Sequence, residues 1–175
     1  LIPLELFDRA LDMLAARSEV DPARLAIVGG SKGAEAALIV AARRADVRAV
    51  VAGMPSSVSW QGIDWNVAKM IVDSPGASWS LGGEPVPFVP YGRPSRAGGD
   101  IIEVYNAGLG ALDQHQDAII PVENIRAPIL LVCGEADTLW PSCPMASEIS
   151  SRAAALNGPA VTVQSYPDAG HAVFG

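Results

Sequence analysis

The chain has 175 residues, of which 50% are hydrophobic and 18% charged, and its formal net charge is −7. This size and composition suffice for one buried core, which excludes a disordered chain. The acidic balance argues against nucleic acid as a partner, because no basic stripe is available to displace counterions from phosphate groups.

The sequence shows no sign of a membrane span or of export. It contains no run of about 18 uninterrupted apolar residues, and residues 1–5 have neither the basic nor the apolar segment of a signal peptide. Cys133 and Cys143 lack the spacing of a disulfide framework, and two isolated histidines add no metal-ligand pattern. We therefore expect a cytoplasmic protein without a metal or cofactor.

The first predicted elements alternate between helix and strand. Apolar residues at helical spacing predict an amphipathic helix over 4–17, which ends before the turn at Asp21-Pro22. Short apolar runs predict buried strands at 24–29 and 47–53, with a helix at 32–45 between them. This order is typical of a parallel sheet with helical crossovers.

The regular alternation stops at Pro55. Residues 55–119 are rich in proline and glycine and contain Trp60, Trp65 and Trp79. A long irregular segment inside a compact domain is usually functional, so we interpret it as an insert that forms a lid or a pocket wall. We expect the three tryptophans and Phe88 either to line a pocket or simply to pack the insert.

The last part of the chain is regular again. Apolar patterns predict a strand at 128–133, a helix over 145–156 and a final strand at 160–166. The complete order favours an α/β domain with a parallel sheet and right-handed crossovers. We expect residues 1–175 to form one domain of this class, interrupted by the insert.

A serine lies between the predicted strand 24–29 and the helix that follows it. The stretch Gly29-Gly30-Ser31-Lys32-Gly33 has the G-x-S-x-G pattern of a nucleophile elbow, whose sharp turn exposes the serine and favours small flanking residues. The backbone N–H of Lys32 is the expected oxyanion donor. The alternative is a glycine turn in which Ser31 caps the helix.

A serine nucleophile needs a base, and the sequence offers two histidines. His171 follows the last predicted strand, where the carboxyl edge of a parallel sheet would bring it close to Ser31. His115 lies in a polar part of the insert and is most simply a surface residue. The pattern therefore favours His171 as the base.

The acid that orients the base should follow the strand at 128–133. Asp137 lies on the loop directly after this strand and can reach the imidazole Nδ1–H, with Glu135 as the fallback. Asp168 is close to His171 in sequence, but Pro167-Asp168 is more typical of a turn. The predicted triad is thus Ser31, Asp137 and His171, in the chain order expected for this type of elbow.

Four stretches of the sequence, three of which contain the predicted triad residues, carry a resemblance to a known family: Gly30–Glu35, Ile120–Glu123, Gly134–Asp137 with Trp140, and Gly170-His171. With them the chain resembles the C-terminal catalytic domain of the acyl-CoA thioesterase and bile acid-CoA:amino acid N-acyltransferase family, in the dienelactone hydrolase-like part of the α/β-hydrolase superfamily. The resemblance implies attack of Ser31 on an acyl thioester, with Asp137 as acid and His171 as base. Family members that transfer the acyl group to an amino acid carry cysteine at the elbow, so serine favours hydrolysis.

The resemblance also implies that the N-terminal strands of the full fold lie outside this chain. We expect the edge of strand 24–29 to be unpaired unless another copy of the chain, or a preceding portion of it, covers that edge.

Three functions stay open at this point. The first is a serine hydrolase acting on a small-molecule acyl thioester or ester, with an acyl pocket that Trp60, Trp65, Trp79 and Phe88 would line. The second is a carboxylesterase, dienelactone-type hydrolase or peptidase with the same triad. The third is a non-catalytic hydrolase-fold interaction module or an inactive fragment.

Overall fold

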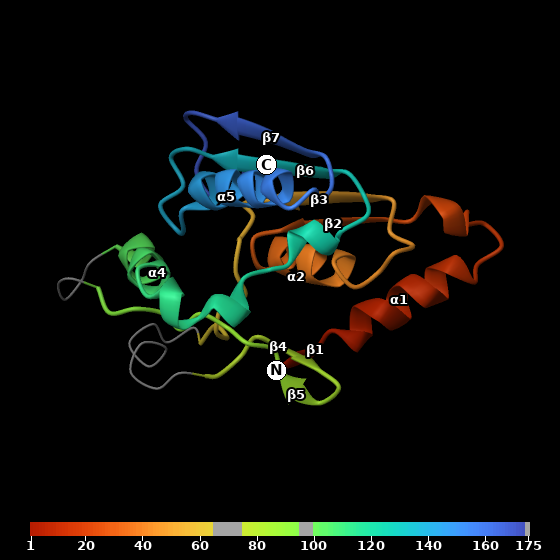
Figure 1. The fold of residues 1–175 in the computed structure, drawn as a ribbon, viewed down its shortest axis with the longest axis horizontal. Coiled ribbons are helices and arrows are strands. Elements are labelled where there is room, and N and C mark those ends of the chain that lie inside the picture. The colour runs from red at the N-terminus through yellow and green to blue at the C-terminus, as the bar shows by residue number, and fades with distance from the viewer. Residues whose placement is uncertain (65–74, 95–99, 174–175) are drawn as a thin grey trace. The chain divides into compact units, whose positions relative to one another are not determined.

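A computed structural model describes residues 1–64, 75–94 and 100–173 of the chain (Figure 1). The chain forms two compact units. The first, here called the insert unit, comprises Leu1–Pro3, Val58–Ile119 and Thr138–Pro141. The second, here called the sheet unit, comprises Leu4–Ser57, Ile120–Asp137 and Ser142–Gly175.

The sheet unit is built on a parallel four-stranded sheet with the order β2-β3-β6-β7. Its strands are β2 (Ala26–Gly30), β3 (Ala49–Gly53), β6 (Ile129–Gly134) and β7 (Val161–Tyr166). Its helices are α1 (Glu5–Ala15), α2 (Lys32–Ala41) and α5 (Ser142–Ala155). These elements confirm the predicted α/β class and parallel sheet.

The two faces of this sheet differ in burial. Helix α2 packs on β2 and β3, and α5 packs on β6 and β7. Val50 and Ile129 are paired in register and buried, so the helices cover the face to which these side chains belong. On the opposite face, Val28 is 69% exposed and Leu130 is 37% exposed. The expectation of a buried strand at 24–29 is wrong for β2, because this strand lies at the end of the described sheet and none of its residues is buried. Strand β2 is also the terminal strand of the sheet, so within the described residues its outer edge has no neighbouring strand, as expected.

The predicted element boundaries need small corrections. The first helix spans Glu5–Ala15 rather than 4–17. The second helix ends at Ala41 rather than continuing to residue 45, and the chain turns soon afterwards. In this turn the guanidinium of Arg44 donates to Asp46 at 2.6 and 2.8 Å. The backbone here makes turn hydrogen bonds, from the N–H of Arg43 to the carbonyl of Val40 and from the N–H of Arg44 to that of Ala41.

The insert unit contains more regular structure than the sequence interpretation allowed. Strand β1 (Ile2–Pro3) pairs in parallel with β4 (Trp79–Leu81), which pairs antiparallel with β5 (Glu84–Pro85). Helix α4 (Ile101–Leu109) was not predicted, and its nine residues include three β-branched residues and a glycine, which are weaker helix formers than alanine or leucine.

The core of the insert unit is aromatic. Trp60 is fully buried and has ring contacts with Tyr91 at 5.8 Å and with Tyr105 at 4.9 Å between ring centroids. Edge-to-face and offset contacts of this kind add to the free energy of apolar burial. Trp60, Tyr91 and Tyr105 therefore pack the core of this unit.

Candidate active site

The turn between β2 and α2 has the backbone of a nucleophile elbow. Ser31 has φ 54° and ψ −123°, a conformation that L-residues rarely adopt. Its N–H donates to the carbonyl of Gly53 at 2.8 Å, and its own carbonyl accepts from the N–H of Ala34 at 2.9 Å. Ser31 is the residue that precedes α2, but its side chain makes no capping hydrogen bond to the helix, which does not support the alternative of a side-chain cap.

The two glycines of the motif differ in what they permit. A Cβ atom on Gly29 would lie 2.1 Å from the carbonyl oxygen of Gly33 and 2.8 Å from the backbone nitrogen of Ala34. A Cβ atom on Gly33 would meet nothing within 4 Å among the described residues. The expectation that the elbow needs a small residue thus holds for Gly29. At Gly33 the structure leaves free space for a Cβ atom.

This contrast gives a prediction for stability. Gly29→Ala should lower the free energy of unfolding by about 2 kcal/mol or more, because backbone atoms of the elbow must move apart. Gly33→Ala should raise it by up to about 1 kcal/mol, because alanine is the better helix former. Urea unfolding followed by circular dichroism checks both variants. Equal effects of the two substitutions would contradict the proposed close approach at Gly29.

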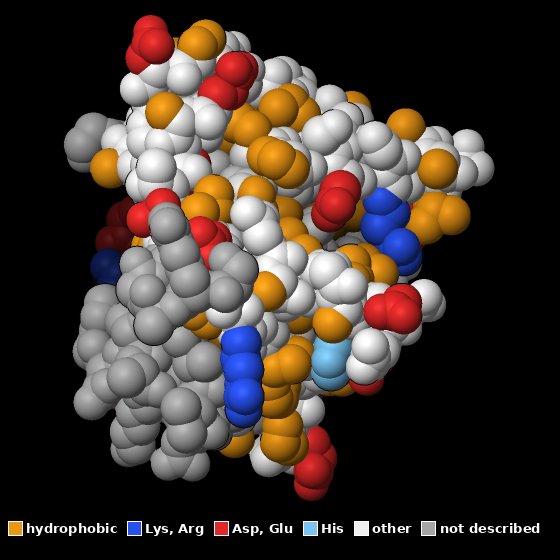
Figure 2. All heavy atoms as spheres, turned by 90° about the vertical axis from the view of Figure 1, so that its left-hand side faces the viewer, with side chains coloured by type: hydrophobic (Ala, Val, Ile, Leu, Met, Phe, Trp, Pro, Cys, Tyr) orange, Lys and Arg blue, Asp and Glu red, His pale blue; other side chains and the backbone are white. Residues whose placement is uncertain are grey.

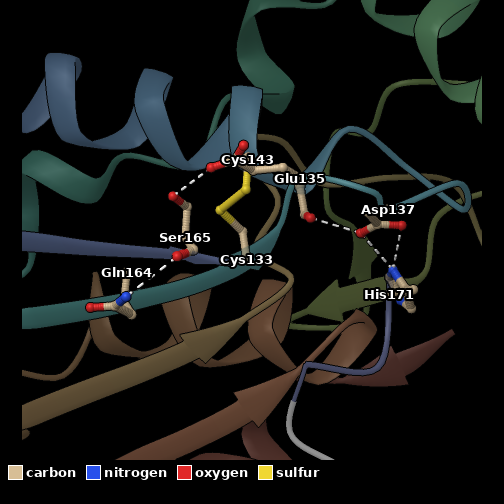
Figure 3. The surroundings of a disulfide bond; sticks show 8 residues. Cys133, Glu135, Asp137, Cys143, Gln164, Ser165 and His171 are labelled. Carbon is tan, nitrogen blue, oxygen red and sulfur yellow. Dashed lines mark hydrogen bonds and ion pairs between the residues drawn. A yellow bond between two sulfur atoms is a disulfide. The ribbon is translucent and has the colours of Figure 1, made fainter. Parts of the chain in front are cut away.

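The structure brings together the three side chains predicted for the triad, all of them in the sheet unit. His171 Nε2 lies 2.8 Å from Ser31 Oγ. His171 Nδ1 lies 3.1 and 2.9 Å from the two carboxylate oxygens of Asp137 (Figure 3). The side chain of Asp137 is 2% exposed and that of His171 is 22% exposed. These partners favour the tautomer in which Nδ1–H donates to the carboxylate and Nε2 accepts from the serine hydroxyl.

Backbone contacts between two loops bring Asp137 and His171 together. The N–H of Glu135 donates to the carbonyl of Tyr166 at 3.0 Å, and the N–H of Ala136 donates to that of Ala169 at 3.1 Å. A Cβ atom on Gly134 would lie 2.1 Å from the carbonyl oxygen of Ala169. Only glycine at this position allows the loops after β6 and β7 to approach so closely.

The other candidates for acid and base have different surroundings. Glu135, the fallback acid, accepts a hydrogen bond from Ser165 Oγ at 2.7 Å. Asp168 is exposed in the turn after β7. His115 is partly exposed and belongs to the insert unit, where it follows a short 3-10 turn. The geometry of the sheet unit therefore favours Asp137 and His171.

A partly buried ion pair lies in the first turn of α2, beside the elbow. Lys32 Nζ donates to the two carboxylate oxygens of Glu35 at 3.0 and 2.8 Å. Glu35 is fully buried. Burial lowers the pKa of the Lys32 ammonium below its ordinary value, and the charge of Glu35 opposes this shift. The sequence interpretation did not identify this pair, although the two residues have the i,i+3 spacing of a helical ion pair.

A disulfide joins the strand that precedes Asp137 to the helix that follows it. Cys133 in β6 and Cys143 in α5 are bonded, with their Cα atoms 5.2 Å apart (Figure 3). The sequence interpretation missed this bond because a separation of ten residues is not diagnostic. Disulfides are rare in a reducing cytoplasm, so the bond weighs against the expected cytoplasmic location.

The residues predicted to line an acyl pocket belong to the insert unit. Trp60 and Trp79 are buried and pack this unit. Phe88 is partly exposed and lines an open groove of about 400 Å³ together with proline side chains. Trp65 lies outside the described residues. A role of these four residues in acyl binding stays a prediction.

The described residues contain no helix long and apolar enough to cross a membrane, and no group of three or more His, Cys, Asp or Glu side chains that could hold a metal ion. On the face drawn in Figure 2, the Lys and Arg side chains of the described residues are scattered among acidic and hydrophobic ones.

Comparison with known proteins identifies relatives in sequence and in fold. Residues 2–174 match the family model described as BAAT / acyl-CoA thioester hydrolase C terminal. Human acyl-coenzyme A thioesterase 2, mitochondrial, is 29% identical over 173 residues, which are 96% of this chain and 32% of the relative. The chain thus spans about a third of that relative's length.

Two solved structures show the same fold at lower identity. A Klebsiella pneumoniae protein assigned as a dienelactone hydrolase is 20% identical with a TM-score of 0.55, covering 97% of this chain and 49% of that one. An acylaminoacyl peptidase from Pyrococcus horikoshii is 12% identical with a TM-score of 0.59, covering 96% of this chain and 23% of that one. These likenesses show an α/β-hydrolase fold and carry no information on substrate.

Proposed function

The chain belongs to the BAAT / acyl-CoA thioester hydrolase C-terminal family, and from this premise we propose that it is a serine hydrolase that cleaves acyl thioesters. Ser31 is the nucleophile, His171 the general base and acid, and Asp137 the residue that orients His171. The hydrogen bond between His171 Nε2 and Ser31 Oγ, with Asp137 on the other ring nitrogen, carries the proposal.

In the first half of the reaction an acyl-enzyme forms. Ser31 Oγ bonds to the acyl carbon while its proton passes to His171 Nε2, 2.8 Å away. The carbonyl oxygen takes the negative charge, and we assign its stabilisation to the backbone N–H of Lys32, the first residue of α2. The carbon–sulfur bond then breaks, and the imidazolium returns its proton to the leaving thiolate.

In the second half water releases the acid. His171 takes a proton from water, whose oxygen bonds to the acyl carbon, and the imidazolium then protonates Ser31 Oγ as the ester bond breaks. Asp137 stabilises the imidazolium in both halves, because its carboxylate is almost fully buried and close to Nδ1.

Hydrolysis of matched substrates tests the proposal. A series of acyl-CoA thioesters is compared with p-nitrophenyl esters of the same acyl chains, and we expect kcat/KM to be about 10-fold or more higher for the preferred thioester. Equal or higher values for short esters would overturn the thioesterase assignment and favour an esterase on the same fold.

Labelling with a fluorophosphonate probe tests the serine mechanism independently of substrate. We expect stoichiometric modification of the wild-type protein, because the probe reacts with an activated serine whatever acyl group the enzyme prefers. A properly folded wild-type protein that stays unlabelled and hydrolyses no member of either series would overturn the proposal and favour a non-catalytic module.

A further inference from the structure

The side chain of Ser142 contacts the carboxylate of Asp137. Ser142 is fully buried, and its Oγ–H donates to Asp137 Oδ2 at 2.7 Å. The same Oδ2 accepts from His171 Nδ1 at 2.9 Å. Burying a carboxylate without hydrogen-bond donors costs free energy of folding. The two donors, Ser142 and His171, also restrict rotation of the carboxylate about the Cβ–Cγ bond.

The two partners of this hydrogen bond belong to a loop and to a helix. Asp137 lies on the loop after β6, whereas Ser142 is the first residue of α5, which packs on β6 and β7. The hydroxyl is thus carried by a packed helix, and the carboxylate by a loop. A side chain on a helix is held in position more precisely than a side chain on a loop.

The disulfide fixes the start of α5 with respect to the sheet. Cys143 is the residue after Ser142, and it is bonded to Cys133 of β6, in the strand that leads into the Asp137 loop (Figure 3). Both ends of the loop are therefore covalently joined, with Asp137 between them and Ser142 at one end.

We propose that Ser142 is a positioning residue for Asp137 and that the Cys133–Cys143 disulfide holds Ser142 in place. The proposal rests on the proposed function, because positioning the acid matters only if His171 acts as a base. Ser142 acts through Asp137. Its hydroxyl contacts the carboxylate of Asp137, that carboxylate contacts His171, and His171 contacts Ser31.

Substitution of Ser142 tests the positioning role. Ser142→Ala should lower kcat about 10-fold with KM unchanged, because a hydrogen bond to a charged group that acts on the transition state is lost. Ser147→Ala, on the exposed side of the same helix, is the matched control and should leave kcat unchanged. An unchanged kcat in Ser142→Ala would overturn the proposal.

A double-mutant cycle separates positioning from a general structural role. In the Asp137→Asn background, Ser142→Ala should change kcat by less than about 2-fold, because the group through which it acts is already altered. Loss of stability alone would instead lower kcat by the same factor in both backgrounds. Equal factors would therefore overturn the proposal.

The Nδ1–H proton of His171 provides a readout that does not require turnover. In a hydrogen bond to a buried carboxylate this proton gives a low-field nuclear magnetic resonance signal, and we expect Ser142→Ala to shift or broaden it while Ser147→Ala does not. An unchanged signal in Ser142→Ala would overturn the positioning role. Absence of the signal in the wild-type protein would overturn the His171–Asp137 pair itself, so the two failures are distinguishable.

The role of the disulfide is tested with Cys143→Ala, which removes the bond and leaves the buried Cys133 in place. We expect a fall in kcat of up to about 10-fold, and no further fall when Cys143→Ala is combined with Ser142→Ala. An unchanged kcat and an unchanged His171 signal in Cys143→Ala would overturn the anchoring role.

Discussion

Replacing Ser31 by alanine is expected to lower kcat for the preferred substrate by about 10⁴- to 10⁶-fold and to abolish labelling by a fluorophosphonate. The substitution removes the atom that bonds to the acyl carbon, so only binding and oxyanion stabilisation would contribute to the remaining rate. Steady-state hydrolysis and mass spectrometry of the labelled protein measure the two effects.

The control for this substitution is another serine replaced in the same way. Ser18→Ala removes a hydroxyl whose hydrogen bond is to the exposed neighbour Glu19, and it should leave kcat and labelling unchanged. Circular dichroism shows whether Ser31→Ala keeps its fold. A folded Ser31→Ala protein with wild-type turnover would contradict the assignment of the nucleophile.

Replacing Asp137 by asparagine should lower kcat by about 10⁴-fold. Asparagine has almost the same shape but carries no charge, so it cannot stabilise the imidazolium, and its amide group favours the wrong tautomer of His171. The short contacts of both carboxylate oxygens with Nδ1 and the nearly complete burial of Asp137 make a large effect expected. The measurement is kcat at saturating substrate.

Glu135→Gln is the matched comparison, because Glu135 is on the same loop and was the alternative acid. Its carboxylate contacts Ser165, so we expect kcat to change by less than about 3-fold. A greater loss in Glu135→Gln than in Asp137→Asn would show that the acid has been assigned to the wrong carboxylate.

Most of the sheet unit could be predicted from its sequence. Parallel strands appear as short apolar runs, and an amphipathic helix shows its 3.6-residue period. Both patterns arise because apolar side chains of these elements pack in the core. Helix α4 was not predicted, since it is short, contains three β-branched residues and a glycine, and lies in a stretch rich in proline and glycine. The end of α2 also differed, because the backbone changes to turn hydrogen bonds after Ala41 and no break in the apolar pattern marks that point.

The sequence by itself determined which residues are candidates for the chemistry. The spacing of Gly29, Ser31 and Gly33 indicates a sharp turn, and the order of serine, acid and histidine follows from the order of the strands. Motifs are local, so they identify residue types and their neighbours along the chain.

Only the tertiary structure decided which candidates meet and what holds them. Asp137 rather than Glu135 faces His171, because contacts between the loops after β6 and β7 set the direction of each side chain. The disulfide and the hydroxyl of Ser142 next to Asp137 were likewise invisible in the sequence. Distances between side chains that are far apart in sequence depend on the packing of whole elements, and no local pattern records them.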